Sequence, residues 1–159
     1  MSLPRVSVRR AETAEEIAAV KAIFLDYLCF VEDFLGESLS FQGTETEFAT
    51  FPGVYDALWL ASVDDTPVGA VGIKPFRDDI CELKRLFVRP AGRGHTLGRR
   101  LTEASIRGAR DMGYVTIYLD TNAGLTHANA VYEGLGFRDI ASYYDNPLGD
   151  SSRYMALAL

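Results

Sequence analysis

A glycine- and arginine-rich turn at residues 88–101 is the part of the sequence whose residue types most clearly suit one kind of chemistry. It reads Val-Arg-Pro-Ala-Gly-Arg-Gly-His-Thr-Leu-Gly-Arg-Arg-Leu and joins an apolar segment to an amphipathic one. The first amides of a helix have no intrahelical partner and carry partial positive charge, so glycines that let an anion approach them create a binding site. The segment therefore predicts a site for a polyphosphate ligand.

The distribution of charge supports this prediction. The chain has 16 Lys and Arg against 22 Asp and Glu, a net charge of −6, which argues against nucleic acid as a partner. Within residues 84–110, however, the only acidic residue is Glu103. Eight basic residues fall there: Lys84, Arg85, Arg89, Arg93, Arg99, Arg100, Arg107 and Arg110. We interpret them as a setting for a small anion, with a solvated basic helix face as the alternative.

Length and composition bound the remaining possibilities. The 159 residues, 48% of them apolar, fit one compact domain, which we expect to span residues 4–159. No segment has the apolar length of a signal peptide core or of a membrane span. We therefore expect a soluble, cytoplasmic protein that binds no membrane. Cys29 and Cys81 are expected to be buried free thiols, and His95 and His127 lack metal-ligand spacing, so no metal is predicted.

Strands and helices that could position the turn are readable on both sides of it. Thr13 to Glu16 is a capping-box pattern, which predicts a helix to about Cys29. Residues 33–53 are interpreted as one or two short helices with loops. The other predicted elements are strands at 5–9, 57–63, 68–75, 80–88, 114–120, 137–140 and 153–157, a helix from the turn to Gly113, and a helix capped by Thr126 and closed by Gly136.

The order of these elements places the turn in the fold. Strand 80–88, a helix and strand 114–120 form a βαβ unit, so the two strands should be parallel with a right-handed crossover. The turn then lies at the carboxyl end of the first strand, where ligands of open α/β sheets usually bind.

Three segments in this order resemble consecutive signatures of the GNAT superfamily of acyl-CoA-dependent N-acetyltransferases. They are Glu82-Leu-Lys-Arg-Leu-Phe-Val-Arg-Pro90, Arg93-Gly-His-Thr-Leu-Gly98 and Tyr132-Glu-Gly-Leu-Gly-Phe137. The resemblance covers nearly the whole chain. It implies an α/β (α+β) fold with a mixed, mostly antiparallel central sheet and one parallel βαβ unit at the cofactor cleft. It also implies acetyl transfer from acetyl-CoA to a primary amine of a small molecule or peptide.

The resemblance also implies which residues hold the cofactor. The backbone of Leu86, Phe87 and Val88 would pair with the pantetheine arm. The pyrophosphate would lie on the turn formed by Arg93, Gly94, His95, Thr96, Leu97, Gly98 and Arg99. Thr96 replaces a glycine of the family pattern, and because a β-branched residue disfavours positive φ, we expect helical backbone there, with Gly94 taking any unusual dihedral. The hydroxyl of Thr96 could add a donor to a phosphate. Leu125 stands where many members of the family have an Asn that contacts the cofactor. Leucine cannot make that hydrogen bond, which is worth about 0.5–1.5 kcal/mol of binding free energy.

Attack of an amine on a thioester needs a neutral nucleophile, stabilisation of the developing oxyanion and a proton for the leaving thiolate. Glu82, an acid in a mostly apolar strand, is the candidate base, directly or through water. The alternative is a carboxylate satisfied by Lys84, Arg85 or a backbone amide. Asp120 is the reserve base.

The resemblance makes Tyr132 the general acid; a core aromatic with a satisfied hydroxyl is its alternative role. We expect the oxyanion donor to be a backbone amide near Phe87 or Val88. Tyr143, Tyr144 and Asp145 could line the acceptor pocket or simply pack within their loop.

Two other functions are compatible with the sequence. One is a non-catalytic acyl-CoA sensor or regulatory partner on the same fold, and the other is a phosphate-binding protein unrelated to coenzyme A. A homodimer through strand edges near the C-terminus is also compatible. The acceptor is not readable from the sequence: protein N-termini, lysines, polyamines, amino acids and antibiotics all stay open.

Overall fold

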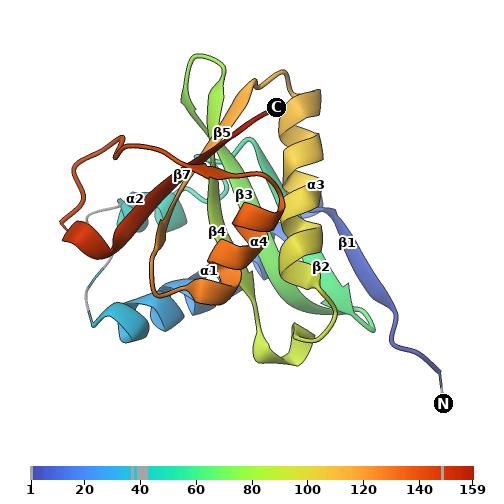
Figure 1. The fold of residues 1–159 in the computed structure, drawn as a ribbon. Helices are drawn as coiled ribbons and strands as arrows, with labels where there is room; N and C mark the ends of the chain where they lie inside the picture. Colours follow the sequence, from blue (N-terminus) through green and yellow to red (C-terminus); the bar gives the residue numbers. More distant parts are fainter. Residues whose placement is uncertain (1, 37, 39–42, 148) are drawn as a thin grey trace.

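The structure is a computed structural model that describes residues 2–36, 38, 43–147 and 149–159. Seven strands form one sheet in the order β1-β2-β3-β4-β5-β7-β6, with helices packed against it (Figure 1). The elements are β1 (Val6–Arg10), α1 (Ala14–Leu35), α2 (Thr44–Ala49), β2 (Ala57–Val63), β3 (Thr66–Arg77), β4 (Ile80–Val88), the 3-10 turn η2 (Pro90–Gly92), α3 (Leu97–Asp111), β5 (Thr116–Asn122), α4 (Thr126–Gly134), β6 (Arg138–Asp139), the 3-10 turn η3 (Gly149–Ser151) and β7 (Ser152–Ala158).

One pair of strands in the sheet is parallel and the other five pairs are antiparallel. Strand β4 pairs with β5 in parallel, with Ile80 opposite Thr116 and Glu82 opposite Tyr118, while the other neighbours are antiparallel. Helix α3 forms the crossover between β4 and β5. The predicted mixed, mostly antiparallel sheet with one βαβ unit is confirmed.

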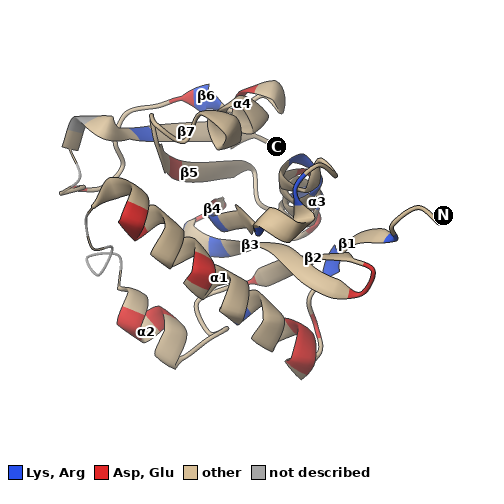
Figure 2. Cartoon of the chain, turned by 90° about the horizontal axis from the view of Figure 1, so that it is seen from below, with Lys and Arg blue, Asp and Glu red and all other residues tan. Residues whose placement is uncertain are grey.

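Side-chain alternation along the strands builds two cores. On β2, Leu58 and Leu60 pack with the α1 residues Val20, Ile23 and Phe24. The intervening β2 residues belong to the core that includes α3, because successive side chains of a strand point to opposite faces. Helices α1 and α2 therefore cover one face of the sheet and α3 and α4 the other, an arrangement that Figure 2 shows from below.

Helix α1 begins as predicted and ends later than predicted. The Thr13 side chain accepts a hydrogen bond from the Glu16 amide, and the Glu16 side chain accepts from the Thr13 amide. The helix continues past Cys29 to Leu35 and is closed by Gly36 in the left-handed conformation. Within the predicted helix-and-loop region 33–53 the structure has α2, while residues 37 and 39–42 lie outside the described residues.

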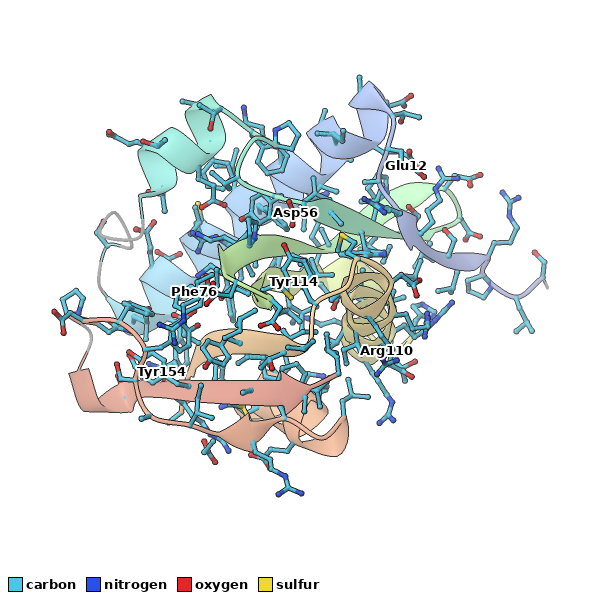
Figure 3. All side chains as sticks on the ribbon, turned by 90° about the horizontal axis from the view of Figure 1, so that it is seen from above. Glu12, Asp56, Phe76, Arg110, Tyr114 and Tyr154 are labelled. Carbon is cyan, nitrogen blue, oxygen red and sulfur yellow. The ribbon has the colours of Figure 1, made fainter. Side chains whose placement is uncertain are left out.

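Helix α3 packs on the sheet through the predicted apolar row, with Leu97, Leu101 and Ala104 buried. Gly108 faces the indole of Trp59 so closely that a Cβ there would overlap the ring. Beyond the helix, the hydroxyl of Tyr114 donates to the carboxylate of Asp56, and the two lie close together in Figure 3. These contacts fix α3, and with it the turn at its N-terminus, relative to the sheet.

Two sequence predictions outside the site are wrong. Thr126 is the first helical residue of α4 rather than its cap, and Leu125 takes the cap position with no side-chain hydrogen bond. Cys29 is exposed because it lies on the outer face of the extended α1, whereas Cys81 is buried as expected. None of the helices over the described residues has the length and apolarity needed to cross a membrane.

Candidate active site

The site is built around an opening between β4 and β5. The two strands pair only from Ile80 to Glu82 and from Thr116 to Tyr118, although β4 continues to Val88 and β5 to Asn122. Beyond Glu82, the β4 edge that faces β5 therefore has no strand partner. We refer to the space between residues 83–88 and 119–122 as the β4–β5 opening.

A β-bulge in β4 determines which side chains reach this opening. Lys84 lies opposite Gly72 and Phe87 opposite Ala70, so two β4 residues, Arg85 and Leu86, occupy the length of one β3 residue. Arg85 has φ of 64°, and the turn of the backbone there breaks the usual alternation. The side chains of Lys84 and Arg85 consequently both lie on the side of the sheet that carries α1 and α2, while Leu86 packs against the core that contains α3.

A small cavity of about 40 Å³ lies at the opening, beneath α1. Its walls come from α1, β4, β5, the start of α4 and the segment that leads into β7. The lining residues are Tyr27, Val31, Leu35, Leu83, Lys84, Arg85, Asp120, Thr121, Asn122, Leu125, Asn146 and Ser152. The α1 part of the lining is mainly apolar and the β4 and β5 part is mainly polar, a combination suited to a small organic molecule with a charged head group.

The two candidate bases belong to one chain of ion pairs. Lys84 Nζ lies 3.3 Å from Asp120 Oδ1 and 3.8 Å from Glu82 Oε2, and Lys74 Nζ lies 4.0 Å from Glu82 Oε1. Burial alone would raise the pKa of Asp120, but Lys84 and Tyr144 lower it overall. Glu82 is 6% exposed. The alternative role predicted for Glu82 is a carboxylate satisfied by Lys84, Arg85 or a backbone amide. Lys84 does contact Glu82, whereas Arg85 pairs with Glu47.

Two successive tyrosines from the β6–β7 loop close over these carboxylates. The hydroxyl of Tyr143 donates to Glu82 Oε2 at 2.7 Å, and that of Tyr144 donates to Asp120 Oδ2 at 2.6 Å. Their rings belong to an aromatic cluster with Phe76, Tyr118 and Tyr154; of these, Phe76 and Tyr154 lie toward the same end of the sheet in Figure 3. The loop therefore takes part in the site. None of the three loop residues singled out lines the cavity itself, and Asp145 is also exposed.

Tyr132 lies on α4, in the core on the α3 side of the sheet, and it is not among the residues that line the cavity. It is 6% exposed and packs edge-on against Phe137 at a ring distance of 5.7 Å. Burial, with smaller contributions from Tyr27 and Asp120, raises the pKa of its hydroxyl. The phenol therefore keeps its proton at neutral pH, as a proton donor must.

Sequence reasoning missed the ion pair that holds the bulge. Arg85 Nη2 donates to Glu47 Oε1 at 2.9 Å and Nε to Oε2 at 3.4 Å, and Tyr55 donates to the same carboxylate at 2.5 Å. Glu47 and Arg85 are both buried. Burial alone would raise the pKa of Glu47, but Arg85 and Tyr55 lower it overall. No local signal links these residues, because Glu47 on α2 and Arg85 on β4 are 38 positions apart in sequence.

The turn before α3 has a backbone that differs from the prediction at one residue. Gly94 has φ of 90°, as expected. Thr96, however, has φ of 54° and ψ of 30°, in the left-handed region rather than the right-handed helical one. Its hydroxyl donates to the carbonyl of His95 at 2.7 Å and is not directed to the helix amides. The local hydrogen bond accompanies a conformation that costs a β-branched residue about 1–2 kcal/mol.

The residues of this turn fit a pyrophosphate. Within the described part of the chain no side chain caps α3, and its first turn has no acidic residue, so its orphan amides are available to solvent or to a ligand. A Cβ at Gly94 or Gly98 would meet nothing within 4 Å, which means that the backbone is open on that side. Arg93 and Arg99 are exposed, with Arg99 3.3 Å from Glu103. His95 is half-buried and Leu97 anchors the helix in the core.

Fewer basic residues surround the turn than the sequence suggested. Lys84 and Arg85 are on the opposite side of β4, as described above, and Arg89 Nε lies 2.7 Å from Asp26 Oδ2 on α1. Arg110 is on the outer face of α3, exposed to solvent (Figure 3). Figure 2 shows the overall separation, with acidic residues on α1 and α2 and basic residues on α3. The positive charge at the turn itself therefore comes from Arg93, Arg99 and Arg100.

The last predicted contacts lie along β4 and at the start of α4. Phe87 packs on Tyr27 and Phe30 at ring distances of 5.9 and 5.5 Å, and the β4 backbone from Leu86 to Val88 lies along the opening. Leu125 lines the cavity. Two asparagines that the sequence did not single out are buried nearby, with Asn129 Nδ2 donating to the carbonyl of Asn122 at 2.9 Å.

Comparison with known proteins agrees with this geometry. Residues 25–137 match the family model of the acetyltransferase (GNAT) family. The chain is 31% identical over 154 residues to an uncharacterized N-acetyltransferase of Schizosaccharomyces pombe, covering 93% of this chain and 92% of that protein. An acetyltransferase structure from Streptococcus agalactiae has a TM-score of 0.75 at 22% identity, covering 97% and 98% of the two chains. A Salmonella typhimurium protein solved with its cofactor acetyl-CoA has a TM-score of 0.66 at 17% identity, covering 96% and 93%.

Proposed function

This chain belongs to the acetyltransferase (GNAT) family, and we propose that it transfers an acetyl group from acetyl-CoA to a primary amine by direct attack, with both substrates bound at once. The observation that carries the proposal is the β4–β5 opening, which has the uncapped, glycine-rich turn at one end and the cavity beneath α1 beside it. A thioester held along β4 would meet an amine held in that cavity without a covalent enzyme intermediate.

The residues proposed to bind acetyl-CoA fall into two groups. The amides of the first turn of α3, opened by Gly94 and Gly98, would bind the pyrophosphate, with Arg93 and Arg99 adding positive charge. His95, Thr96 and Leu97 complete the turn. The β5-facing edge of β4 at Leu86, Phe87 and Val88 would hold the pantetheine arm as an added strand would be held. When bound, acetyl-CoA supplies the activated acyl group.

Glu82 is proposed to accept the proton that the acceptor amine loses. Its carboxylate is buried and hydrogen-bonded to Tyr143, so the proton would arrive through the tyrosine hydroxyl or through a water beside it. Asp120 is the weaker candidate, because Lys84 and Tyr144 lower its pKa overall and a lower pKa makes a poorer base. We assign it to acceptor binding.

Tyr132 is proposed to hold the proton that the leaving sulfur requires. Tyr132 is buried against Phe137, and its hydroxyl carries a proton at neutral pH that it could donate. A backbone amide of β4 near Phe87 or Val88 would donate to the oxygen on which negative charge develops. Such fixed donors contribute strongly because they need no reorganisation during the reaction.

A thiol-release assay with acetyl-CoA and a panel of primary amines tests the proposal. The expected result is release of free thiol that depends on an amine and is matched by an acetylated product in mass spectrometry. Acetyl-CoA binding by calorimetry, without release in the presence of any amine, would contradict direct transfer.

A further inference from the structure

Building on the proposed acetyl transfer, we propose that the acceptor is a small zwitterion, an amino acid with an apolar side chain. Its amino group would face Asp120, its carboxylate would face Lys84, and its side chain would lie against α1. The three parts of this proposal rest on the charge balance of the site, on the spacing of two ionised groups and on the composition of one wall.

The ionised groups at the site already balance one another. Lys74, Glu82, Lys84 and Asp120 form a chain of ion pairs with two positive and two negative members. Arg85 and Glu47 form a second, separate pair. An acceptor with a net charge would leave that charge uncompensated in a largely buried place, which is costly. A zwitterion adds no net charge, and this favours it over a polyamine or an alkylamine.

Lys84 and Asp120 present their opposite charges side by side in the cavity wall. Lys84 Nζ and Asp120 Oδ1 are 3.3 Å apart, and each side chain is 12% exposed. Burial opposes both charges, but each partner favours the ionised form of the other, which raises the pKa of Lys84 and lowers that of Asp120. The amino and carboxylate groups of an amino acid are joined through one carbon, so both can reach this pair together and each meets the opposite charge.

The wall facing these charges is apolar. Tyr27, Val31 and Leu35 recur every fourth residue along α1 and line the cavity. The stacked rings of Phe30 and Phe34 lie on the neighbouring row of the same helix, 41% and 50% exposed. The cavity of about 40 Å³ has room for only a few waters. That space suits the head group of a small molecule better than a polypeptide segment.

The first experiment compares acceptors that carry or lack the carboxylate, with each kcat/KM expressed per neutral amine, because a change at the carboxylate also changes the amine pKa. The wild-type protein is assayed with L-leucine, L-leucinamide and isopentylamine, and with the corresponding series based on L-phenylalanine. We expect kcat/KM for the free amino acid to exceed that for its amide and amine by on the order of tenfold or more in at least one series. Equal or higher values for the amides and amines would overturn the proposal.

A pair of variants tests whether Lys84 carries the discrimination. Lys84→Met should bring the kcat/KM values of the amino acid and its amide to within about twofold of each other, whatever it does to the overall rate. Lys74→Met is the matched control, because Lys74 belongs to the same chain of ion pairs but does not line the cavity. It should leave the ratio unchanged. A preference that survives Lys84→Met would contradict the assignment of the carboxylate to Lys84.

Failure of this inference differs from failure of the proposed function. If neither amino acid series is acetylated while other amines in the broader panel are, the zwitterion is wrong and acetyl transfer stands. If acetyl-CoA binds and no amine of any class is acetylated, the proposed function and the inference both fall.

Discussion

Arg85 on β4 and Glu47 on α2 form a buried ion pair, with Arg85 Nη2 2.9 Å from Glu47 Oε1. Arg85 is the residue with positive φ in the β4 bulge. The ion pair therefore attaches α2 to β4 at the bulge, next to the β4–β5 opening. Both side chains are under 10% exposed. The contact thus links the packing of α2 on the sheet to the backbone geometry of the β4 bulge.

Glu47→Gln should lower the free energy of unfolding at pH 7 by about 3–5 kcal/mol, because it leaves the Arg85 charge buried without its partner. Chemical denaturation measures this. Asp26→Asn, which removes the exposed partner of Arg89, is the control and should cost less than about 1 kcal/mol. Equal effects of the two substitutions would show that the buried pair has no special role.

The same variant should change the pH dependence of stability. The pKa of Glu47 is lower in the folded protein, so its contribution is present above the ordinary carboxyl value of about 4.3 and is lost as pH falls through the folded value. The wild-type protein should therefore lose more stability than Glu47→Gln as the pH falls from about 6 to about 3. Parallel curves would contradict a lowered pKa.

Gly108→Ala should destabilise the fold, because the new methyl group would overlap Trp59. We expect the free energy of unfolding to fall by about 1–3 kcal/mol, partly offset by the higher helix propensity of alanine. Gly98→Ala provides the comparison on the same helix, since a Cβ there meets nothing within 4 Å, and should be neutral or stabilising. Thermal unfolding of the two variants decides; a stable Gly108→Ala protein would mean that α3 can move away from the sheet.

Most of the fold could be predicted because it depends on local patterns. The capping box at Thr13, the β4 boundaries and the apolar row of α3 are all readable from neighbouring residues, and the order of elements then dictates the parallel pair. The end of α1 was not predicted, because the helix continues past Cys29 with Leu28 and Val31 packed beneath it and ends only where Gly36 takes the left-handed conformation.

The site was only partly predictable. The proposals for Glu82, Tyr132 and the turn at 93–99 come from sequence signatures, whereas the bulge at Arg85 and its pairing with Glu47 depend on contacts between distant segments. Their nearness in sequence groups Lys84 and Arg85 with the predicted phosphate site. The strand direction and the bulge instead place both on the side of the sheet that carries α1 and α2.

Thr96→Gly should leave acetyl-CoA affinity within about twofold of wild type and stabilise the fold by up to about 1 kcal/mol, since glycine adopts the left-handed conformation without penalty. Arg93→Gln should weaken binding, and more so at low salt, where screening is small. Isothermal titration calorimetry measures both. A large loss of affinity in Thr96→Gly would show that the hydroxyl, bonded to His95 in this structure, binds phosphate.

Glu82→Gln should lower kcat by about a hundredfold or more and flatten the acidic limb of the pH–rate profile, because the group whose protonation stops the reaction is gone. Asp120→Asn should act mainly on KM of the acceptor. Steady-state rates measured from about pH 5 to about pH 9 distinguish the effect on kcat from the effect on KM. If Asp120→Asn flattens the profile and Glu82→Gln does not, the base is Asp120.

The most direct test of acetyl transfer at the β4–β5 opening is the pair of constants kcat and acetyl-CoA Kd for Tyr132→Phe, with the best amine of the panel as acceptor. The buried hydroxyl is proposed to protonate the leaving sulfur, and a general acid contributes roughly a hundredfold to ten-thousandfold. We predict a fall in kcat of that size with Kd within about twofold of wild type. A wild-type kcat in Tyr132→Phe would contradict this assignment of the chemistry.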